Sequence, residues 1–303
     1  KKRISKNKLP SCQLVRLKTE AVALSAEDLN RKSQARLKDQ RLLAPLMFTQ
    51  IEQTLAKGEQ VIVLVGRRGF AHYLLSSETN KPLLCPECSI SLTLHKKNKA
   101  LHCHYCGFSS PLKQFAGDEK QKFIAVGSGA EKLEAYLQER FPQKKVARLD
   151  SELTSSAAKL RACLADFRAR KIDLLVGTQV LAKGHDFSGV SLVCMLELDQ
   201  MLDFPDFRAG EKTLQLIVQA AGRAGRAELA GQVLMQTFRQ DHPVLEQALS
   251  YDYQGFAEKE LAFRRLHAYP PFTRMILCEF SSSFESDLRK LELDLRRYCQ
   301  AES

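Results

Sequence analysis

Arg223 and Arg226 have the residue type and the spacing to bind one phosphate chain. Gly222 and Gly225 each cost a helix about 1 kcal/mol relative to Ala, so a helix before them should end there and present both arginines from its last turn. Planar guanidinium groups at that step can hold a polyanion, as they do on a transferring phosphate. The alternative is a solvated helix end whose cations complement the helix dipole. The apolar positions fall at i, i+3, i+4 and i+7 and predict one buried face, made of Leu214, Ile217, Val218 and Ala221.

Two Cys-x-x-Cys pairs, with 14 residues between them, have the spacing of a zinc site. Four thiolates complete the tetrahedron that zinc prefers and leave no open position, so the metal would be structural. The alternative is four free cysteines in a polar segment, and three histidines nearby are spare donors. The alternation in residues 91–94 predicts one arm of a small hairpin. The predicted ligands are Cys85, Cys88, Cys103 and Cys106.

Arg67 and Arg68 follow a continuous apolar run over residues 60–65, which predicts a buried strand of a parallel sheet. Binding sites in open α/β sheets lie at the carboxyl ends of strands, so these arginines are placed to meet phosphate. The alternative is that they are surface residues of a loop between a strand and a helix. Gly127-Ser128-Gly129 opens a predicted helix and is either an anion-binding turn or a plain tight turn.

The elements that must position these residues alternate between strand and helix. Apolar periodicity predicts helices over about 42–57, 130–140 and 157–169. Short apolar runs predict strands over 60–65, 123–126, 145–149, 172–176 and 192–196. Alternation of this kind from residue 42 to 239 predicts an α/β fold with a parallel sheet and helices on both faces.

The net charge of +11 comes from two stretches of the 303 residues. Residues 1–40 carry 11 Lys or Arg against 4 Asp or Glu, and residues 81–122 carry 7 against 3, which gives +7 and +4. Localised basicity favours a polyanionic partner over an uncharged one. Nine cysteines with four in close pairs are typical of a reducing compartment with a metal. Since no apolar run approaches the roughly 18 residues of a membrane span, we expect no membrane contact and a cytoplasmic location.

Two motifs in one α/β domain resemble motifs V and VI of superfamily 2 helicases. The first is Gly177-Thr178-Gln179 followed by residues 183–187, and the second is Gln219-x-x-Gly222-Arg223-x-Gly225-Arg226. An arginine-glycine loop at residues 67–70 that leads into the cysteine pairs is similar to one group of these helicases, and so is the 205–209 segment. The sequence over roughly residues 42–280 resembles the primosomal replication-restart helicase family PriA.

The resemblance implies a domain organisation. Residues 1–40 would end a preceding lobe and its linker. Residues 41–82 and 120–240 would form the second, RecA-like helicase lobe, and residues 83–119 would be an inserted zinc-ribbon module. Residues 241–303 would begin an α+β C-terminal domain, and the whole sequence would be part of a longer protein.

The resemblance also implies residue roles. Arg226 would be the arginine finger of ATP hydrolysis, with Arg223 beside it on the phosphates. Gln219, Gly184 and Asp186 would contact the nucleotide. The DNA contacts would be made by Arg67, Arg68, Thr178, Gln179 and Lys183.

The implied activity is ATP-dependent 3′-to-5′ DNA translocation in replication restart. Its partners would be forked or single-stranded DNA, the primosome and single-strand-binding proteins. The first lobe is absent from this sequence, which has no Gly-x-x-x-x-Gly-Lys-[Ser/Thr] loop to hold a triphosphate. We therefore expect ATP and magnesium to bind only when that lobe is present, and this chain alone to be inactive.

Two further departures from the family pattern alter the expectations. The family usually has eight cysteines for two zinc ions, but residues 76–80 and 115–120 carry none, so we expect a single zinc. Ala130 stands where a threonine is frequent. Two alternatives remain: a non-catalytic zinc-ribbon module for DNA binding or scaffolding, and another superfamily 2 translocase that acts on RNA or chromatin.

Overall fold

A computed structural model of the chain describes most of its residues. These are residues 9–17, 23–25, 42–66, 73–76, 79, 82–87, 91–95, 100–103, 107–111, 122–126, 129–149, 157–178, 181, 187–204, 206–225, 230–276, 280 and 284–301. The chain divides into two compact units, Lys1–Phe256 and Ala257–Ser303.

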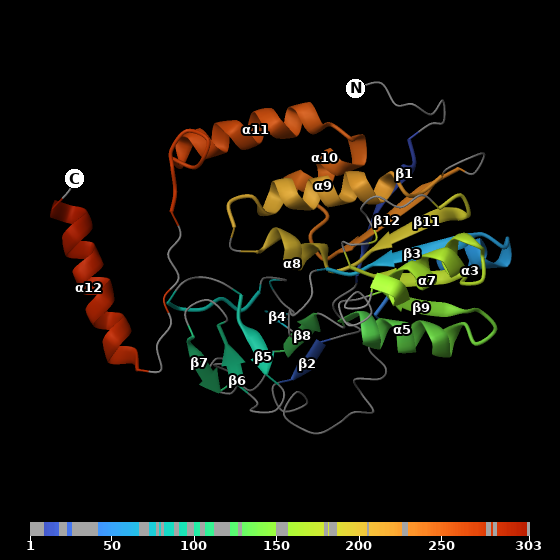
Figure 1. Ribbon diagram of the computed structural model, residues 1–303, viewed down its shortest axis with the longest axis horizontal. Helices are drawn as coiled ribbons and strands as arrows, with labels where there is room; N and C mark the ends of the chain where they lie inside the picture. The colour runs from blue at the N-terminus through green and yellow to red at the C-terminus, as the bar shows by residue number, and fades with distance from the viewer. Residues whose placement is uncertain are drawn as a thin grey trace. The chain divides into compact units, whose positions relative to one another are not determined.

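A parallel sheet forms the centre of the first unit (Figure 1). Within the described residues it has six strands, and every neighbouring pair is parallel. The predicted parallel sheet is therefore confirmed. The strands, in spatial order, are β1 (Ser11–Arg16), β12 (Gln232–Thr237), β11 (Val190–Met195), β3 (Gln60–Leu64), β10 (Leu174–Gly177) and β9 (Val146–Leu149).

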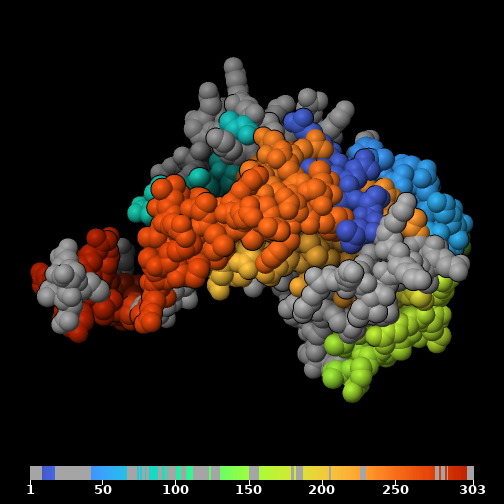
Figure 2. Space-filling model, turned by 90° about the horizontal axis from the view of Figure 1, so that it is seen from above, coloured from blue at the N-terminus to red at the C-terminus, as the bar shows by residue number. Residues whose placement is uncertain are grey.

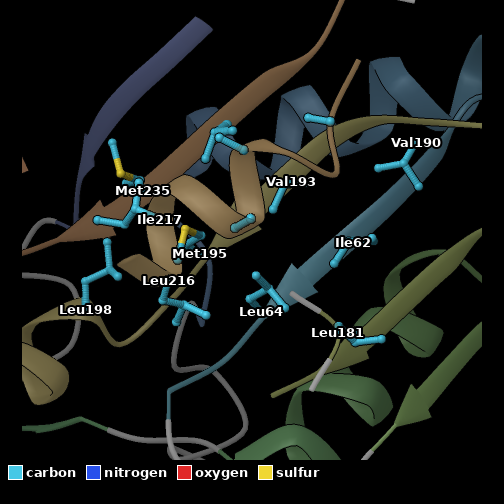
Figure 3. Close-up of a cluster of buried hydrophobic side chains, with 14 of the residues drawn as sticks. Ile62, Leu64, Leu181, Val190, Val193, Met195, Leu198, Leu216, Ile217 and Met235 are labelled. Carbon is cyan, nitrogen blue, oxygen red and sulfur yellow. The ribbon is translucent and has the colours of Figure 1, made fainter. Parts of the chain in front are cut away.

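Helices cover both faces of this sheet because alternate residues of its central strands point to opposite sides. Ile62 and Leu64 enter the core under α7 (Ala157–Arg168), α8 (Leu198–Leu202), α9 (Ala209–Ala221) and α10 (Pro243–Ser250), part of which is shown in Figure 3. Val61 and Val63 enter the opposite core, under α3 (Pro45–Ala56) and α5 (Gly129–Arg140). These cores fix the strands whose ends carry the candidate site residues.

Strand β1 belongs to the parallel sheet, although it lies before the boundary expected for the lobe at residue 41. It is an edge strand with alternating exposed positions, so its sequence lacks the continuous apolar run of the central strands. The Cys12 thiol lies 3.0 Å from the Tyr251 hydroxyl, which donates to the Pro10 carbonyl at 2.8 Å. Figure 2 shows β1 (blue) against the orange surface of the α10 region, far from it in sequence.

A second sheet contains the cysteine-rich segment. Its strand order is β2 (Ala23–Ser25), β8 (Lys122–Val126), β4 (Tyr73–Ser76), β5 (Thr93–His95), β6 (Ala100–His102) and β7 (Ser109–Pro111), with antiparallel pairing throughout. The predicted hairpin arm at residues 91–94 is confirmed by β5. The assignment of residues 123–126 to the parallel sheet was wrong, because β8 pairs antiparallel with β2 and β4. A short apolar strand before a helix does not reveal its partner, and here Phe123 fills the small core of the second sheet.

Helix α9 buries three of the four residues predicted for its core face, Leu214, Ile217 and Ala221. It ends at Ala221 with Gly222 as its C-cap, as the glycines predicted. Val218 was expected in the core but is 41% exposed, whereas Thr213 and Ala220 are fully buried. The buried face is centred on positions 213, 217 and 220, because the helix packs against both the sheet and α10.

The boundary after the parallel-sheet unit lies later than residue 240. The apolar face of α10 packs into the core of the lobe through Val244 and Leu245, and Phe256 joins the same core. The described part of the second unit holds the end of α11 (Tyr253–Leu266) and α12 (Glu285–Ala301). Among the described residues of the whole chain, none of the helices is long and apolar enough to span a membrane.

Candidate functional site

The turn after α9 places Arg223 beside the first residue of β11. The Arg223 N–H donates to the Ala220 carbonyl at 2.9 Å, and the Gly225 N–H donates to the Val190 carbonyl at 3.0 Å. Gly225 has φ +67°, a left-handed conformation that favours glycine. The turn is therefore fixed to the amino edge of the parallel sheet. Arg226 lies outside the described residues, and Gln219 lies on the exposed side of α9.

The same edge of the sheet receives the end of the 183–187 motif. Phe187 is 1% exposed and packs edge-on against Phe167, with ring centroids 4.9 Å apart. The Val190 N–H donates to the Phe187 carbonyl at 3.4 Å. Phe187 is therefore bonded to Val190, the same residue whose carbonyl accepts the hydrogen bond from Gly225. Lys183, Gly184 and Asp186 lie outside the described residues. The described ends of the two motifs, Phe187 and the 222–225 turn, thus both lie at the amino edge of β11.

Gly231 allows the start of β12 to pack closely against the turn after α9. No sequence pattern pointed to this residue. A Cβ atom at this position would lie 2.6 Å from both the carbonyl carbon of Ala224 and the nitrogen of Gly225. Both are backbone atoms, so only glycine lets β12 start so close to the turn that carries Arg223. The sequence shows a glycine before a strand, but only the structure shows what that glycine touches.

Thr178, the one described residue among the proposed DNA contacts, follows a strand at the opposite, carboxyl edge of the sheet. Gly66 and Thr178 follow the neighbouring parallel strands β3 and β10, and the Val65 N–H donates to the Gly177 carbonyl at 2.9 Å. Thr178 is only 6% exposed. Arg67, Arg68 and Gln179 lie outside the described residues.

A buried carboxylate, Asp199, ties the carboxyl ends of β11 and β12 together. It is 3% exposed and accepts hydrogen bonds from the Thr237 hydroxyl at 2.8 Å and the Phe238 N–H at 3.1 Å. The Arg239 guanidinium lies 3.4 Å from Asp199 and 2.9 Å from Asp203. Burial opposes the charge of Arg239, but the two carboxylates outweigh it and raise the pKa of Arg239. The structure makes Asp199 the anchor of this edge.

The imidazole of His242 caps helix α10 and gives this region a predicted pH dependence. Its Nδ1 accepts a hydrogen bond from the Val244 N–H at 3.3 Å, which requires an unprotonated Nδ1. Burial, together with the charge of Arg239, lowers the pKa of His242 from 6.5, although Asp199 and Asp241 oppose the shift. The unfolded chain therefore binds this proton more readily, and the free energy of unfolding should decrease as the pH falls below about 6.5.

His242→Asn tests this dependence, because asparagine can cap the helix but does not titrate. Denaturant unfolding at about pH 7.5 and about pH 5.5 should show a smaller decrease for this variant than for wild type. His242→Ala is the matched control, and it should cost about 1 kcal/mol at the higher pH because the cap is lost. An unchanged pH dependence in His242→Asn would assign the effect to other groups.

Asp206 holds the approach to α9 in place. It accepts hydrogen bonds from the Arg208 backbone N–H and Nε, each at 2.9 Å, and it pairs with the Lys212 ammonium. Burial favours the neutral acid, but these hydrogen bonds outweigh it and lower the pKa of Asp206 well below its usual range. The ion pairs are partly exposed and each contributes little to stability on its own. Together they define the conformation of the 206–212 segment.

Each cysteine pair begins in a tight turn of the second sheet. Leu84 and Ser91 form a β-bridge that encloses the first pair, and the His102–Ser109 register of β6 and β7 encloses the second. The Gly107 N–H donates to the Cys103 carbonyl at 3.1 Å, with Gly107 at φ +78°, a conformation that favours glycine.

Cys85 and Cys103 are 1% and 3% exposed in the same small core. Cys88 and Cys106 lie outside the described residues. Among the residues that are described, no group of three potential metal ligands comes together. Two buried thiols in one small core fit a structural zinc site.

Comparisons with known families agree with this geometry. The helicase conserved C-terminal domain matches residues 109–228, and the PriA DNA helicase Cys-rich region domain matches residues 85–111. With the parallel sheet and its helices, these matches define the chain as the C-terminal, RecA-like domain class of helicases with a cysteine-rich insertion.

Full-length relatives specify the family. The replication restart protein PriA of Chlamydia muridarum is 40% identical over 262 residues, which are 85% of this chain and 34% of that protein. PriA of Haemophilus influenzae is 40% identical over 83% of this chain and 35% of its own length, and PriA of Bacillus subtilis is 36% identical over 78% and 29%. The chain belongs to the PriA family of replication restart proteins. It spans about a third of the length of these relatives.

Proposed function

We propose that this chain is the second RecA-like lobe of an ATP-dependent 3′-to-5′ DNA helicase for replication restart and primosome assembly in the cytoplasm. The position of the described ends of both motifs at the amino edge of β11 is the observation that carries the proposal. A hydrogen bond from Gly225 to Val190 joins the turn of Arg223 to the strand that follows the 183–187 motif. Separate surface loops would have no reason to share this anchor, whereas one nucleotide site requires it.

The nucleotide side of the proposal assigns roles at this edge. Arg226 acts as the arginine finger and Arg223 as its partner on the phosphates, because guanidinium groups neutralise the charge that spreads over a transferring phosphoryl group. Gln219, Gly184 and Asp186 contact the nucleotide. ATP and magnesium are supplied on the first lobe, so this chain alone is expected to hydrolyse no ATP.

The DNA side of the proposal assigns the carboxyl edge. Arg67, Arg68, Thr178 and Gln179 contact the DNA backbone there, as sites in open α/β sheets lie beyond the carboxyl ends of strands. Lys183, at the start of the 183–187 motif, is proposed as a further DNA contact. Strands β3 and β10 are parallel neighbours, so the segments that follow their carboxyl ends start side by side. Helices and strands that run from one edge to the other connect the DNA contacts with the nucleotide contacts, so nucleotide state can alter the hold on DNA.

The cysteine-rich insertion is proposed to hold one zinc ion through Cys85, Cys88, Cys103 and Cys106. Support comes from the match to the Cys-rich region and from the two buried thiols that share one small core. A closed four-thiolate site supplies folding energy and no catalysis. Single-stranded or forked DNA, primosome components and single-strand-binding proteins are the proposed partners.

The proposal is tested by measuring unwinding by the full-length protein on two partial duplexes, one with a 3′ single-stranded tail and one with a 5′ tail. We expect DNA-stimulated ATP hydrolysis and unwinding of the 3′-tailed duplex only. Unwinding of the 5′-tailed duplex alone would overturn the polarity. DNA binding without any ATP hydrolysis would favour a non-catalytic scaffold.

A further inference from the structure

The second unit carries a segment rich in aromatic and cationic residues that the proposed function does not use. Residues 263–276 contain three arginines, one histidine and three aromatic residues, and no Asp or Glu. The segment comprises the end of α11 and the turns that follow it. Aromatic side chains interleaved with cations in an acid-free stretch are typical of single-stranded nucleic acid binding.

Three rings of this segment lie together, and two of them, Phe263 and His267, are exposed. The Phe263 and His267 ring centroids are 4.2 Å apart, and each lies 6.3 Å from the Tyr269 centroid. Phe263 is 48% exposed. A second ring, Phe272, is 39% exposed and has the Arg265 guanidinium 4.7 Å from its centroid. The segment therefore offers two ring platforms, one of which already has a cation against it.

Backbone hydrogen bonds hold the rings in this arrangement. The Tyr269 N–H donates to the Arg264 carbonyl at 2.7 Å, and the Phe272 N–H donates to the Tyr269 carbonyl at 3.1 Å. Ala268 has φ +52°, which reverses the chain directly after α11. Since the turns fix the ring positions before a ligand arrives, binding costs little ordering of the chain.

The arginines of the segment differ in availability. Arg264 is paired with Glu260, with both its Nε and Nη2 at 2.9 Å from one carboxylate oxygen, and it is 9% exposed. Arg265 and Arg274 are exposed. These two cations next to exposed rings match a ligand that combines flat aromatic groups with negative charges.

We infer that residues 263–276 form a binding site for single-stranded DNA, with bases stacked on Phe263 and Phe272 and phosphates against Arg265 and Arg274. The inference rests on the proposed function, since DNA is the ligand of both, and it adds a contact outside the parallel-sheet lobe. Duplex DNA is excluded from the ring contacts because its bases are already stacked on one another. The site would hold the strand irrespective of sequence, because every base has a π face.

The absence of tryptophan from the sequence permits a direct test of base stacking. Phe272→Trp in this chain introduces one fluorophore at the proposed platform, and oligothymidylate of about 16 nucleotides is the probe. We expect the tryptophan fluorescence to be quenched as the oligonucleotide binds. Leu261→Trp is the control, since Leu261 is also exposed on α11, two residues from Phe263 and therefore on another face. Equal quenching in both variants would overturn the stacking.

Affinity measurements provide a second test that does not depend on the tryptophan. The double variant Phe263→Ala, Phe272→Ala should bind oligothymidylate about 10-fold or more weakly, whereas the control Leu266→Ala, which removes an 81% exposed side chain, should bind as wild type does. Arg265→Gln should reduce the slope of log affinity against log salt by about 1.

The outcomes separate this inference from the proposed function. If the chain binds the oligonucleotide but the double variant keeps its affinity and the fluorescence of Phe272→Trp does not change, the inference is wrong and the proposed function stands. If the chain binds no single-stranded DNA at low salt, the inference and the DNA-binding part of the proposed function both fail. High salt weakens the phosphate contacts. If the double variant still binds oligothymidylate as wild type does at high salt, stacking on Phe263 and Phe272 does not contribute to binding.

Discussion

Replacing Arg226 by Ala in the full-length protein is expected to lower the rate of ATP hydrolysis about 10³-fold or more. An arginine that contacts the transferring phosphoryl group stabilises charge that is largest in the transition state, so its loss lowers kcat more than it raises KM. The structure motivates this prediction through Arg223, whose turn is held at the amino edge of β11. Single-stranded DNA binding should remain close to that of wild type, because most of the proposed DNA contacts lie at the carboxyl edge.

Three further variants distinguish loss of a catalytic arginine from a nonspecific loss of ATP hydrolysis. Arg226→Lys keeps the charge but loses the planar fork, and it should recover only part of the rate. Arg161→Ala removes an exposed arginine on α7 and should change nothing. Gly231→Ala, whose Cβ would press on Ala224 and Gly225, should shift the turn and lower turnover although residue 231 touches no nucleotide. Near-native hydrolysis by Arg226→Ala, measured under saturating DNA, would remove Arg226 from the catalytic role.

The second large effect is expected from metal removal. The chain should contain one zinc ion, and a chelator should unfold the cysteine-rich module while the parallel sheet stays folded. The small core of the second sheet consists of few side chains, among them Leu92, Leu94 and Leu101. A structural zinc contributes an apparent binding free energy of about 10–16 kcal/mol, an amount comparable to the burial of all the apolar side chains of so small a core.

Elemental analysis and hydrogen exchange measure this effect together. After chelation, amides of β6 should lose protection, whereas amides of β3 at the centre of the parallel sheet should keep it. Cys103→Ser should behave as the chelated chain does, and Cys163→Ser, a half-buried thiol on α7, should retain the metal. Two zinc ions per chain would mean that histidines or carboxylates complete a second site, and none would overturn the zinc module.

The sequence alone predicted much of the first unit because its signals are local. Continuous apolar runs at β3 and β10 identified buried strands, and helical periodicity identified α3, α5 and α7. The glycines at 222 and 225 located the end of α9, since they act on the backbone of the helix that contains them. The spacing of the cysteine pairs is likewise a property of a short segment.

The tertiary structure decided whatever depends on partners distant in sequence. Phe123 belongs to a strand whose sheet could not be read from five apolar residues, and Val218 is exposed because the buried face of α9 is centred on other positions. Gly231 and Asp199 have roles only because β12 begins beside the turn of Arg223 and ends beside β11. Local sequence determined which residues form strands, helices and motifs, because those depend on neighbouring backbone and periodicity. Which motifs meet depends on the packing of the whole chain, because no local pattern records a contact between residues separated by tens of positions.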